Sequence, residues 1–541
     1  MKHDDCSRAP SNRIASFILF VTVAAVPFPF GSTAPAVIAF WCIVLGLGVI
    51  FLSPRRLRRE HLPLLGLAVI VVLAFTFVLH EQLAAVPWMA SSNPLWGESA
   101  EALNIPIEPS VSIARNAPFF ALGASLANML AVICSFMVCI DGNRARQLLS
   151  VIAWSGVAYA VYGIAAYLID PTHILWREAP ALHTLSSTFN WRSTAAVYFG
   201  ACSVLWLLFL LRDIRKRLSL YSMYWKSTPS LLLSEVPFLP FMMLLVCLTA
   251  MLLTYSRSGV VLSFMALALA FWGYFYRDLR RRRWVGAGLL IGGLTAFIFF
   301  EIFAGNIVER LNVEGLSDEG RVQTYRSMLR MIVDHPWFGT GLGTFVWSFP
   351  AYRGGAIWGI WGYAHSTSLE LAGDLGLPLT GLIGLAWLAV LVVLIRGVRT
   401  RRNDRIVPVG ALAVASLGLT HSFIDFSFQN PGYAIVVFAL VGAGLAQSFS
   451  SNNVSRTRIN PAPSLVTADT KPPLTQTVLS RSHIGKADIH LDKINLTNKM
   501  LKLLLAVRKI SALDSCLRSR YANHREKDAK RYARCGHRPR T

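Results

Sequence analysis

His365 stands at the start of a predicted helix, in the segment YAHSTSLELAGDLGLP. Thr367 and Glu370 have the spacing of a capping box, which is typical of a helix N-terminus. The positive end of a helix disfavours a second positive charge, so the imidazole there should be neutral and able to accept a proton near pH 7. The pattern therefore predicts a general base at His365, with a histidine that only makes hydrogen bonds as the alternative.

Two arginines stand at the ends of apolar runs, where a guanidinium lies close to hydrocarbon. Arg257 lies in the short segment TYSRSG between two such runs, and Arg192 lies just before a third. A guanidinium in this position either reaches toward the membrane surface or binds a phosphate through its paired N–H donors. Both residues are therefore candidates for holding a phosphorylated substrate.

A third segment, SDEGRVQTYRSMLRMIVDHP, has the apolar spacing of an amphipathic helix. Its predicted apolar face consists of Val322, Tyr325, Met328, Leu329, Ile332 and Val333. Arg321 falls in the first turn, where a cation opposes the helix dipole, and Arg326 lies further along the same helix. An anionic substrate would stabilise this arrangement, as would an ion pair from Arg321 to Asp318 or Glu319. Arg321 and Arg326 are therefore further candidates for substrate binding.

The composition predicts the elements that position these residues. The chain has 541 residues, of which 54% are hydrophobic and only 15% charged, whereas a soluble domain carries about 25% charged residues. This excludes an ordinary soluble enzyme, a disordered regulator and a disulfide-rich secreted module, and it predicts an all-α polytopic membrane protein. The net charge of +23 comes from short basic clusters between apolar runs, which indicates membrane orientation and no nucleic-acid partner.

Twelve apolar runs approach the length of about 20 residues that a helix needs to cross a bilayer. These predicted transmembrane helices are 14–31, 34–52, 63–80, 119–140, 148–169, 194–211, 237–254, 259–276, 284–303, 377–395, 406–421 and 431–449. The loops between them alternate in charge, with 21 Lys and Arg residues in one set and 9 in the other. The positive-inside rule places the richer set and both termini in the cytoplasm.

The opposite side then carries three long loops, 81–118, 170–193 and 304–376. The last of these holds His365, Arg321 and Arg326, and its helical pattern predicts a large periplasmic loop that contains short helices. Its many Trp and Tyr residues suit either a cap at the membrane interface or a surface on which sugars stack. The candidate residues therefore gather on one face of the membrane.

Residues 450–541 form a separate basic cytoplasmic tail. Residues 451–480 are rich in Ser, Thr, Asn and Pro, which predicts a linker. Beyond the linker, an apolar stripe consists of Leu496, Met500, Leu503, Leu504, Val507 and Ile510. The region after 450 has 19 basic and 6 acidic residues, so it forms either an amphipathic helix on anionic membrane lipids or a solvated, disordered tail.

Two further functions remain as alternatives to an enzyme. A multi-span transporter of a small anion or polysaccharide would use the outer arginines as a filter, and a membrane scaffold would use none of them in chemistry. The predicted spans hold no Asp, Glu, Lys or Arg away from their edges. Ion-coupled transporters place ionisable groups there, so this pattern disfavours the transporter.

These residues resemble the O-antigen ligase and O-antigen polymerase superfamily of bacterial envelope glycan enzymes. TYSRSG followed by a span, GRVQTYRSMLRMIVDHPWFGTGLGTF and AHSTSLELAGDLGLPLTGLIG are similar to the shared core of that family in order and spacing. HSFIDFSFQNP, with His421 and Asp425, is similar to the family's last outer turn. STFNWRSTAAVYFG is similar to the segment that opens an earlier span, although Asn usually flanks the arginine where Trp191 and Ser193 stand here. The resemblance covers about residues 186–445 of a predicted membrane domain at 1–449.

The resemblance implies a fold like that of GT-C-type glycosyltransferases, in the bacterial inner membrane, with the active face toward the periplasm. The donor would be a glycan on undecaprenyl pyrophosphate, used in O-antigen or exopolysaccharide biosynthesis. The acceptor would be lipid A–core for a ligase, or another lipid-linked repeat for a polymerase. Because this donor carries its own leaving group, no cofactor is implied, and the outer loops show no Asp-x-Asp pattern that would imply a metal.

In this interpretation His365 is the base that activates the acceptor hydroxyl. Arg257, Arg192, Arg321 and Arg326 bind the pyrophosphate and stabilise the charge that develops as it leaves.

Overall fold

The structure is a computed structural model that describes residues 10–53, 57–179, 184–220, 237–279, 319–355, 359–401 and 405–449. The predicted span at 284–303 and the predicted tail at 450–541 lie outside these ranges and stay predictions. Within the described ranges the fold is built of helices, with one short antiparallel hairpin. Its strands are β1 (His173–Ile174) and β2 (Arg177–Glu178), in which His173 pairs with Glu178.

Eleven apolar helices in the described ranges coincide with the other eleven predicted runs. They are α1 (Pro10–Ala25), α2 (Pro35–Ile50), α3 (Leu62–Leu83), α5 (Ala117–Val138), α6 (Gly142–Ile169), α7 (Arg192–Leu220), α9 (Phe238–Leu253), α10 (Arg257–Leu279), α15 (Leu377–Thr400), α16 (Ile406–Ser422) and α17 (Pro431–Ser448). Seven of these are long and apolar enough to cross a membrane, namely α3, α5, α6, α7, α10, α15 and α17, whereas α1, α2, α9 and α16 are shorter. The chain is therefore a multi-pass helical membrane protein, and the count of twelve spans stays a prediction.

Proline marks several of these helix boundaries. Five of the helices, α2, α3, α5, α15 and α17, carry a proline at one of their first two positions, where the missing N–H costs no hydrogen bond. The first predicted run continued to residue 31, but α1 ends at Ala25. Pro27 and Pro29 follow directly and prevent the helix from continuing. The chain then turns through the 3-10 helix η2 (Phe30–Ser32), where Gly31 has a φ of +67°.

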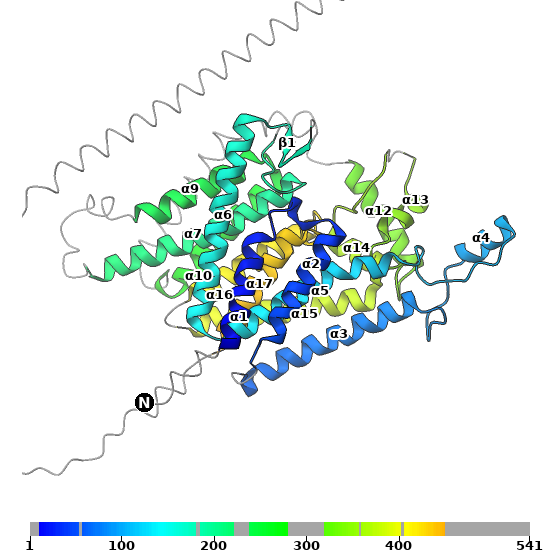
Figure 1. The fold of residues 1–541 in the computed structure, drawn as a ribbon, viewed down its shortest axis with the longest axis horizontal. Coiled ribbons are helices and arrows are strands. Elements are labelled where there is room, and N and C mark those ends of the chain that lie inside the picture. The colour runs from blue at the N-terminus through cyan, green and yellow to red at the C-terminus, as the bar shows by residue number, and fades with distance from the viewer. Residues whose placement is uncertain are drawn as a thin grey trace, which may run out of the picture. The chain divides into compact units, whose positions relative to one another are not determined.

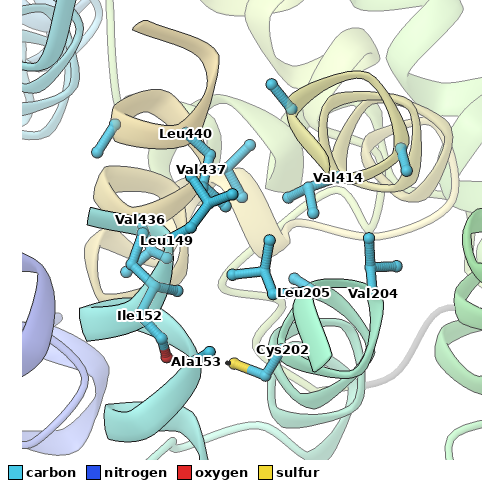
Figure 2. Close-up of a cluster of buried hydrophobic side chains, with 14 of the residues drawn as sticks. Leu149, Ile152, Ala153, Cys202, Val204, Leu205, Val414, Val436, Val437 and Leu440 are labelled. Carbon is cyan, nitrogen blue, oxygen red and sulfur yellow. Dashed lines mark hydrogen bonds between the residues drawn. The ribbon is translucent and has the colours of Figure 1, made fainter. Parts of the chain in front are cut away.

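The helices α7 and α17 form the centre of the bundle, because 94% of the membrane-spanning window of each is buried inside the protein. The corresponding fraction is 11% for α3 and α15, which leaves their apolar side chains to face lipid. Helix α17 packs on α5 and α16, and α7 packs on α9 and α10. Figure 2 shows part of the core, where Leu149 and Ile152 of α6 meet Cys202 and Leu205 of α7 and Val437 of α17.

Small residues allow the central helices to approach closely. A Cβ atom on Gly442 of α17 would lie 2.6 Å from the carbonyl oxygen of Val132 on α5. A Cβ atom on Gly444 would overlap the side chain of Ala411 on α16. Without a hydrophobic driving force between helices in lipid, this close packing is what holds a transmembrane bundle together.

In the part of the chain that the structure describes, four α-helices lie outside the apolar set. They are α4 (Leu95–Leu103), α12 (Glu319–Asp334), α13 (Phe345–Tyr352) and α14 (Thr367–Leu375). Figure 1 shows α12, α13 and α14 together at one end of the bundle, where they pack on one another. Their shared apolar core, the cap core, consists of Met328, Met331, Phe345, Phe349 and Ala364. The described part of the long loop is thus a folded cap that contains short helices.

The predicted apolar face of α12 was wrong in part. Val322, Leu329 and Val333 are 42%, 54% and 74% exposed. Met328 and Ile332 are buried as predicted, and Thr324, Ser327 and Met331 are buried beside them. Thr324 can point inward because its hydroxyl donates to the backbone oxygen of Gly320, so burying the polar group costs little. The helix is therefore rotated relative to the face that its apolar residues alone predicted.

The glycine-rich segment after α12 forms turns. Gly339 and Gly343 have φ values of +68° and +72°, a conformation that residues with a Cβ atom rarely adopt. The segment docks on α14, where the Gly343 N–H donates to Asp374 Oδ2 at 2.7 Å. Gln82 of α3 connects the glycine-rich segment and α14 to the bundle. Its Nε2 donates to Phe338 O at 2.7 Å and to Asp374 O at 2.8 Å.

Candidate active site

The turn after α16 holds a buried cluster of polar side chains. His421 and Asp425 are four residues apart, and His421 Nε2 lies 3.9 Å from Asp425 Oδ2. The Nδ1 of His421 is 3.0 Å from the Ser427 hydroxyl, which lies in the 3-10 helix η5 (Ser427–Gln429). Asp425 Oδ1 accepts the N–H of Phe426 at 2.8 Å. A buried carboxylate is therefore held in place from two sides at the end of the bundle.

His365 reaches the same carboxylate from the cap. Its Nδ1 lies 3.7 Å from Asp425 Oδ1, and 29% of the His365 side chain is exposed, against 4% for Asp425. Burial raises the pKa of the Asp425 carboxyl. The neighbouring His365 and His421 imidazoles, the Phe426 N–H and the nearby Ser193 side chain outweigh this effect, so the pKa lies below its usual value. An ionised carboxylate at this distance can stabilise an imidazolium on His365.

The backbone of His365 is clamped in an uncommon conformation. Its φ is +53°, which is unusual for a residue with a side chain and persists only where neighbours enforce it. On one side the N–H of Ala364 donates to Glu370 Oε2 at 2.8 Å. On the other side the Tyr325 hydroxyl of α12 donates to the His365 carbonyl at 2.8 Å. The backbone at His365 is therefore held by α12 and α14 together.

The cap of α14 differs from the predicted capping box. Ser366 is the N-cap, and its hydroxyl accepts the N–H of Leu369 at 3.4 Å. Thr367 is the first helical residue. Its hydroxyl and its N–H both donate to Asp425 O, at 3.1 Å and 3.3 Å. Glu370 turns to the N–H of Ala364 instead of the N-cap. The helix start was predicted correctly, and its polar groups bind to the turn after α16.

Arg321 lies at this turn as well. Its guanidinium donates to the carbonyl oxygen of Ile424, the residue before Asp425, at 3.4 Å. Arg321 and Tyr325 are four residues apart and therefore lie on one face of α12. This face brings the Arg321 cation to the turn after α16 and the Tyr325 hydroxyl to the His365 carbonyl. The Arg326 side chain is exposed on α12, and among the described contacts none joins it to this turn. Its role in substrate binding stays a prediction.

Arg192 and Arg257 are the first residues of two helices that pack side by side. Helices α7 and α10 approach so closely that a Cβ atom on Gly259 would lie 2.6 Å from the Ala196 side chain and 3.5 Å from Ser193 O. The start of α7 also meets the polar cluster, with the Thr194 hydroxyl 3.4 Å from that of Ser427. Both arginines are partly exposed. Two arginines therefore begin two neighbouring helices beside the polar cluster, and their role in binding an anion stays a prediction.

The structure therefore brings together His365 and Arg321, and it places Arg192 and Arg257 on the helices that adjoin them. Sequence reasoning did not assign site roles to Asp425, Ser427 or Tyr325. The four-residue spacing of His421 and Asp425 was the available signal, because two such residues at a helix end share one face. Among the residues that the structure describes, no three His, Cys, Asp or Glu side chains are grouped to hold a metal ion.

The fold and this site define a class: a multi-pass helical membrane protein with a His–Asp pair and arginines under a folded cap. Residues 242–384 match the family model described as O-Antigen ligase. The matched segment includes Arg257, Arg321, Arg326 and His365, and it confirms the resemblance to the O-antigen ligase and polymerase superfamily. No curated protein matches the chain. The match of this segment and the apolar helices support a membrane protein of the glycan-transferring ligase or polymerase kind, with a part in lipopolysaccharide biosynthesis.

Proposed function

We propose that this protein transfers a glycan from undecaprenyl pyrophosphate to an acceptor hydroxyl at the periplasmic face of the bacterial inner membrane. The acceptor is lipid A–core or another lipid-linked repeat. The observation that supports this best is the His365–Asp425 pair, because it joins a partly exposed imidazole to a buried carboxylate. His365 lies inside the segment that the family model matches, and Asp425 lies outside it. The arginines around the pair suit a pyrophosphate.

In the proposed reaction, the acceptor oxygen forms a bond to the anomeric carbon of the glycan while the bond from that carbon to the pyrophosphate oxygen breaks. The Nδ1 of His365 is buried toward Asp425, which leaves Nε2 to take the proton of the acceptor hydroxyl. Asp425 stabilises the imidazolium that results. The bonding electrons leave with the pyrophosphate, and its added negative charge is stabilised by Arg257, Arg192 and Arg321, with Arg326 as a weaker contact.

The orientation in the membrane is part of the proposal. The site lies where α7, α10 and α15 begin and α16 ends. At the opposite ends of these helices lie Arg212, Arg215, Arg217, Arg396, Arg399, Arg401 and Arg405. Cytoplasmic ends carry the excess of Lys and Arg, so the site faces the periplasm and both termini lie in the cytoplasm.

Reconstitution tests this function. The purified full-length protein, placed in proteoliposomes, would receive lipid-linked glycan extracted from the host membranes and, in separate reactions, lipid A–core or a second portion of lipid-linked glycan. Glycan attached to lipid A–core would identify a ligase, and longer lipid-linked chains would identify a polymerase. The proposal would be contradicted if the folded, membrane-inserted protein formed neither product from the host's lipid-linked glycan.

A further inference from the structure

A continuous cluster of aromatic rings leads from the start of α7 to His365. Tyr363 and Phe426 stack with ring centroids 4.3 Å apart and planes 9° from parallel. Trp191 stands nearly perpendicular to both rings, 5.4 Å from Tyr363 and 5.1 Å from Phe426. The His365 ring in turn lies 5.0 Å from Phe426 and 5.4 Å from Trp361. Because Trp191 is nearly equidistant from both stacked rings, it lies alongside their edges.

Packing of the protein interior accounts for only part of this aromatic cluster. Phe426 is 3% exposed and anchors the other rings, but Trp191 and Tyr363 are only partly buried. The cap core, built around Met328 and Phe345, does not include either of them. A partly exposed Trp or Tyr ring offers apolar contact area and a polar group to a ligand, which is why these residues are enriched at interfaces.

The position of Trp191 is fixed by its neighbours in the chain. The next two residues lead into α7, and Ser193 lies near enough to Asp425 to help lower the pKa of its carboxyl. The Thr194 hydroxyl lies 3.4 Å from the Ser427 hydroxyl. Trp191 is thus rigidly tied to the same turn as the His365–Asp425 pair, and a ligand that contacts its ring lies close to both.

A polar group accompanies the rings. Burial and the nearby charge of Glu370 raise the pKa of the Tyr363 hydroxyl, which therefore stays protonated and can donate a hydrogen bond. Pyranose rings combine an apolar face of C–H groups with hydroxyls at the edge. The C–H groups carry partial positive charge and are attracted to the negative face of an aromatic ring, and the hydroxyls need polar partners.

We propose that Trp191, with Tyr363 beside it, forms a hexopyranose subsite that holds the sugar next to the scissile bond and helps determine which glycan is accepted. This rests on the proposed function, since it assumes that a glycan is placed at His365. Trp191 binds and orients the sugar and takes no part in proton transfer.

The experiment measures glycan binding apart from transfer. The probe is the free oligosaccharide released by mild acid from the host's lipid-linked glycan, added to the full-length protein in nanodiscs and followed by saturation-transfer NMR on the sugar C–H protons. The background variant is His365→Ala, so that no turnover contributes. We expect Trp191→Leu, which keeps an apolar side chain but has no aromatic face, to weaken binding about threefold to tenfold, and Trp191→Phe to retain most of it.

Trp347→Leu is the matched control, because Trp347 is 65% exposed on α13. This variant should leave binding unchanged.

Transfer kinetics with the native His365 complete the test. Trp191→Leu should raise the KM for the donor or acceptor glycan and leave kcat within about twofold. Unchanged binding and KM in Trp191→Leu would overturn the subsite while leaving the proposed function intact. Normal transfer by His365→Ala would overturn the proposed base, and the binding comparison would still decide the subsite.

Discussion

The Nδ1 atom of His365 lies 3.7 Å from the Oδ1 atom of Asp425. The two residues come from turns that precede α14 and follow α16, and Thr367 joins these turns by donating two hydrogen bonds to Asp425 O. A buried carboxylate beside an imidazole orients one ring nitrogen and stabilises the charge that appears when the other takes a proton. Asp425 thus supplies what a lone histidine in an outer loop would lack as a general base.

The carboxylate should be required for rate. We expect Asp425→Asn to lower kcat for glycan transfer by about a hundredfold or more, because an amide does not stabilise the imidazolium. Steady-state kinetics in proteoliposomes measure this. The control is Asp170→Asn, since Asp170 pairs with His173 at 2.8 Å in an exposed loop and should not affect transfer. Wild-type kcat in Asp425→Asn would remove the carboxylate from the mechanism.

Glu370 should make the stability of the protein depend on pH. Burial raises the pKa of Glu370 from 4.5 to about 7, so the folded protein binds this proton more tightly than the unfolded chain. The stability that this provides is complete below about pH 4.5 and is lost as the pH rises to about 7, by at most about 3 kcal/mol. Ala364 N–H, Asp374, Tyr363 and the Gln429 side chain face this carboxyl.

We expect Glu370→Gln to flatten the fall in thermal midpoint between pH 5 and pH 7, measured in detergent. The amide oxygen of Gln can still accept the Ala364 N–H, so the clamp on His365 and most of the transfer activity should remain. Glu81→Gln is the matched control: Glu81 is another buried carboxylate that accepts backbone N–H groups, from Trp88, Met89 and Ala90. A Glu370→Gln protein with the same pH profile as the wild type would show that Glu370 does not titrate in this range.

The arginine at the start of α10 should act through its paired donors. We expect Arg257→Lys to lower transfer and Arg257→Ala to abolish it at matched protein levels, since Lys keeps the charge but not the planar fork that binds phosphate. Arg330→Ala, at an exposed position on α12, is the control and should transfer normally. Gel analysis of surface glycans in a deletion strain gives the readout, and a normal glycan ladder with Arg257→Ala would refute the pyrophosphate role.

The helices of the bundle could be predicted from the sequence because the signals for each one lie within its own segment. Length, apolar content and a proline at the start are enough to place α3 or α15, whatever they contact. The face of α12 could not be predicted this way. Thr324 and Ser327 are buried in it while Leu329 and Val333 are exposed, since the packing partners on α14 come from a distant segment.

The same distinction holds for the site: residues with local signals could be predicted, and contacts between distant segments could not. His365 and Arg321 were found from local helix signals and from the family resemblance. Their meeting at Asp425 depends on how the cap folds onto the end of α16, which no local spacing encodes. Trp191 had no local signal for contact with Tyr363 and Phe426, because three separate turns must converge before the rings meet.

The orientation can be measured independently of catalysis. Reporter fusions after residues 100 and 340 should report the periplasm, and fusions after residues 280 and 400 the cytoplasm, because the basic clusters lie at the cytoplasmic ends. Alkaline phosphatase and a cytoplasmic fluorescent reporter at each position provide opposite signals. A cytoplasmic result at residue 340 would place His365 on the wrong side of the membrane for this reaction.

The most direct test of the account is the single-turnover rate of glycan transfer by purified His365→Gln. Gln can position an acceptor hydroxyl by hydrogen bonding but cannot take its proton at neutral pH. If His365 is the base, the rate should fall by about a hundredfold to ten-thousandfold, as it should in His365→Ala, while binding of the lipid-linked donor and insertion in the membrane remain. His173→Gln, the histidine of the exposed Asp170 pair, should transfer at the wild-type rate. A near-wild-type rate in His365→Gln would contradict the account and leave His365 as an orienting group.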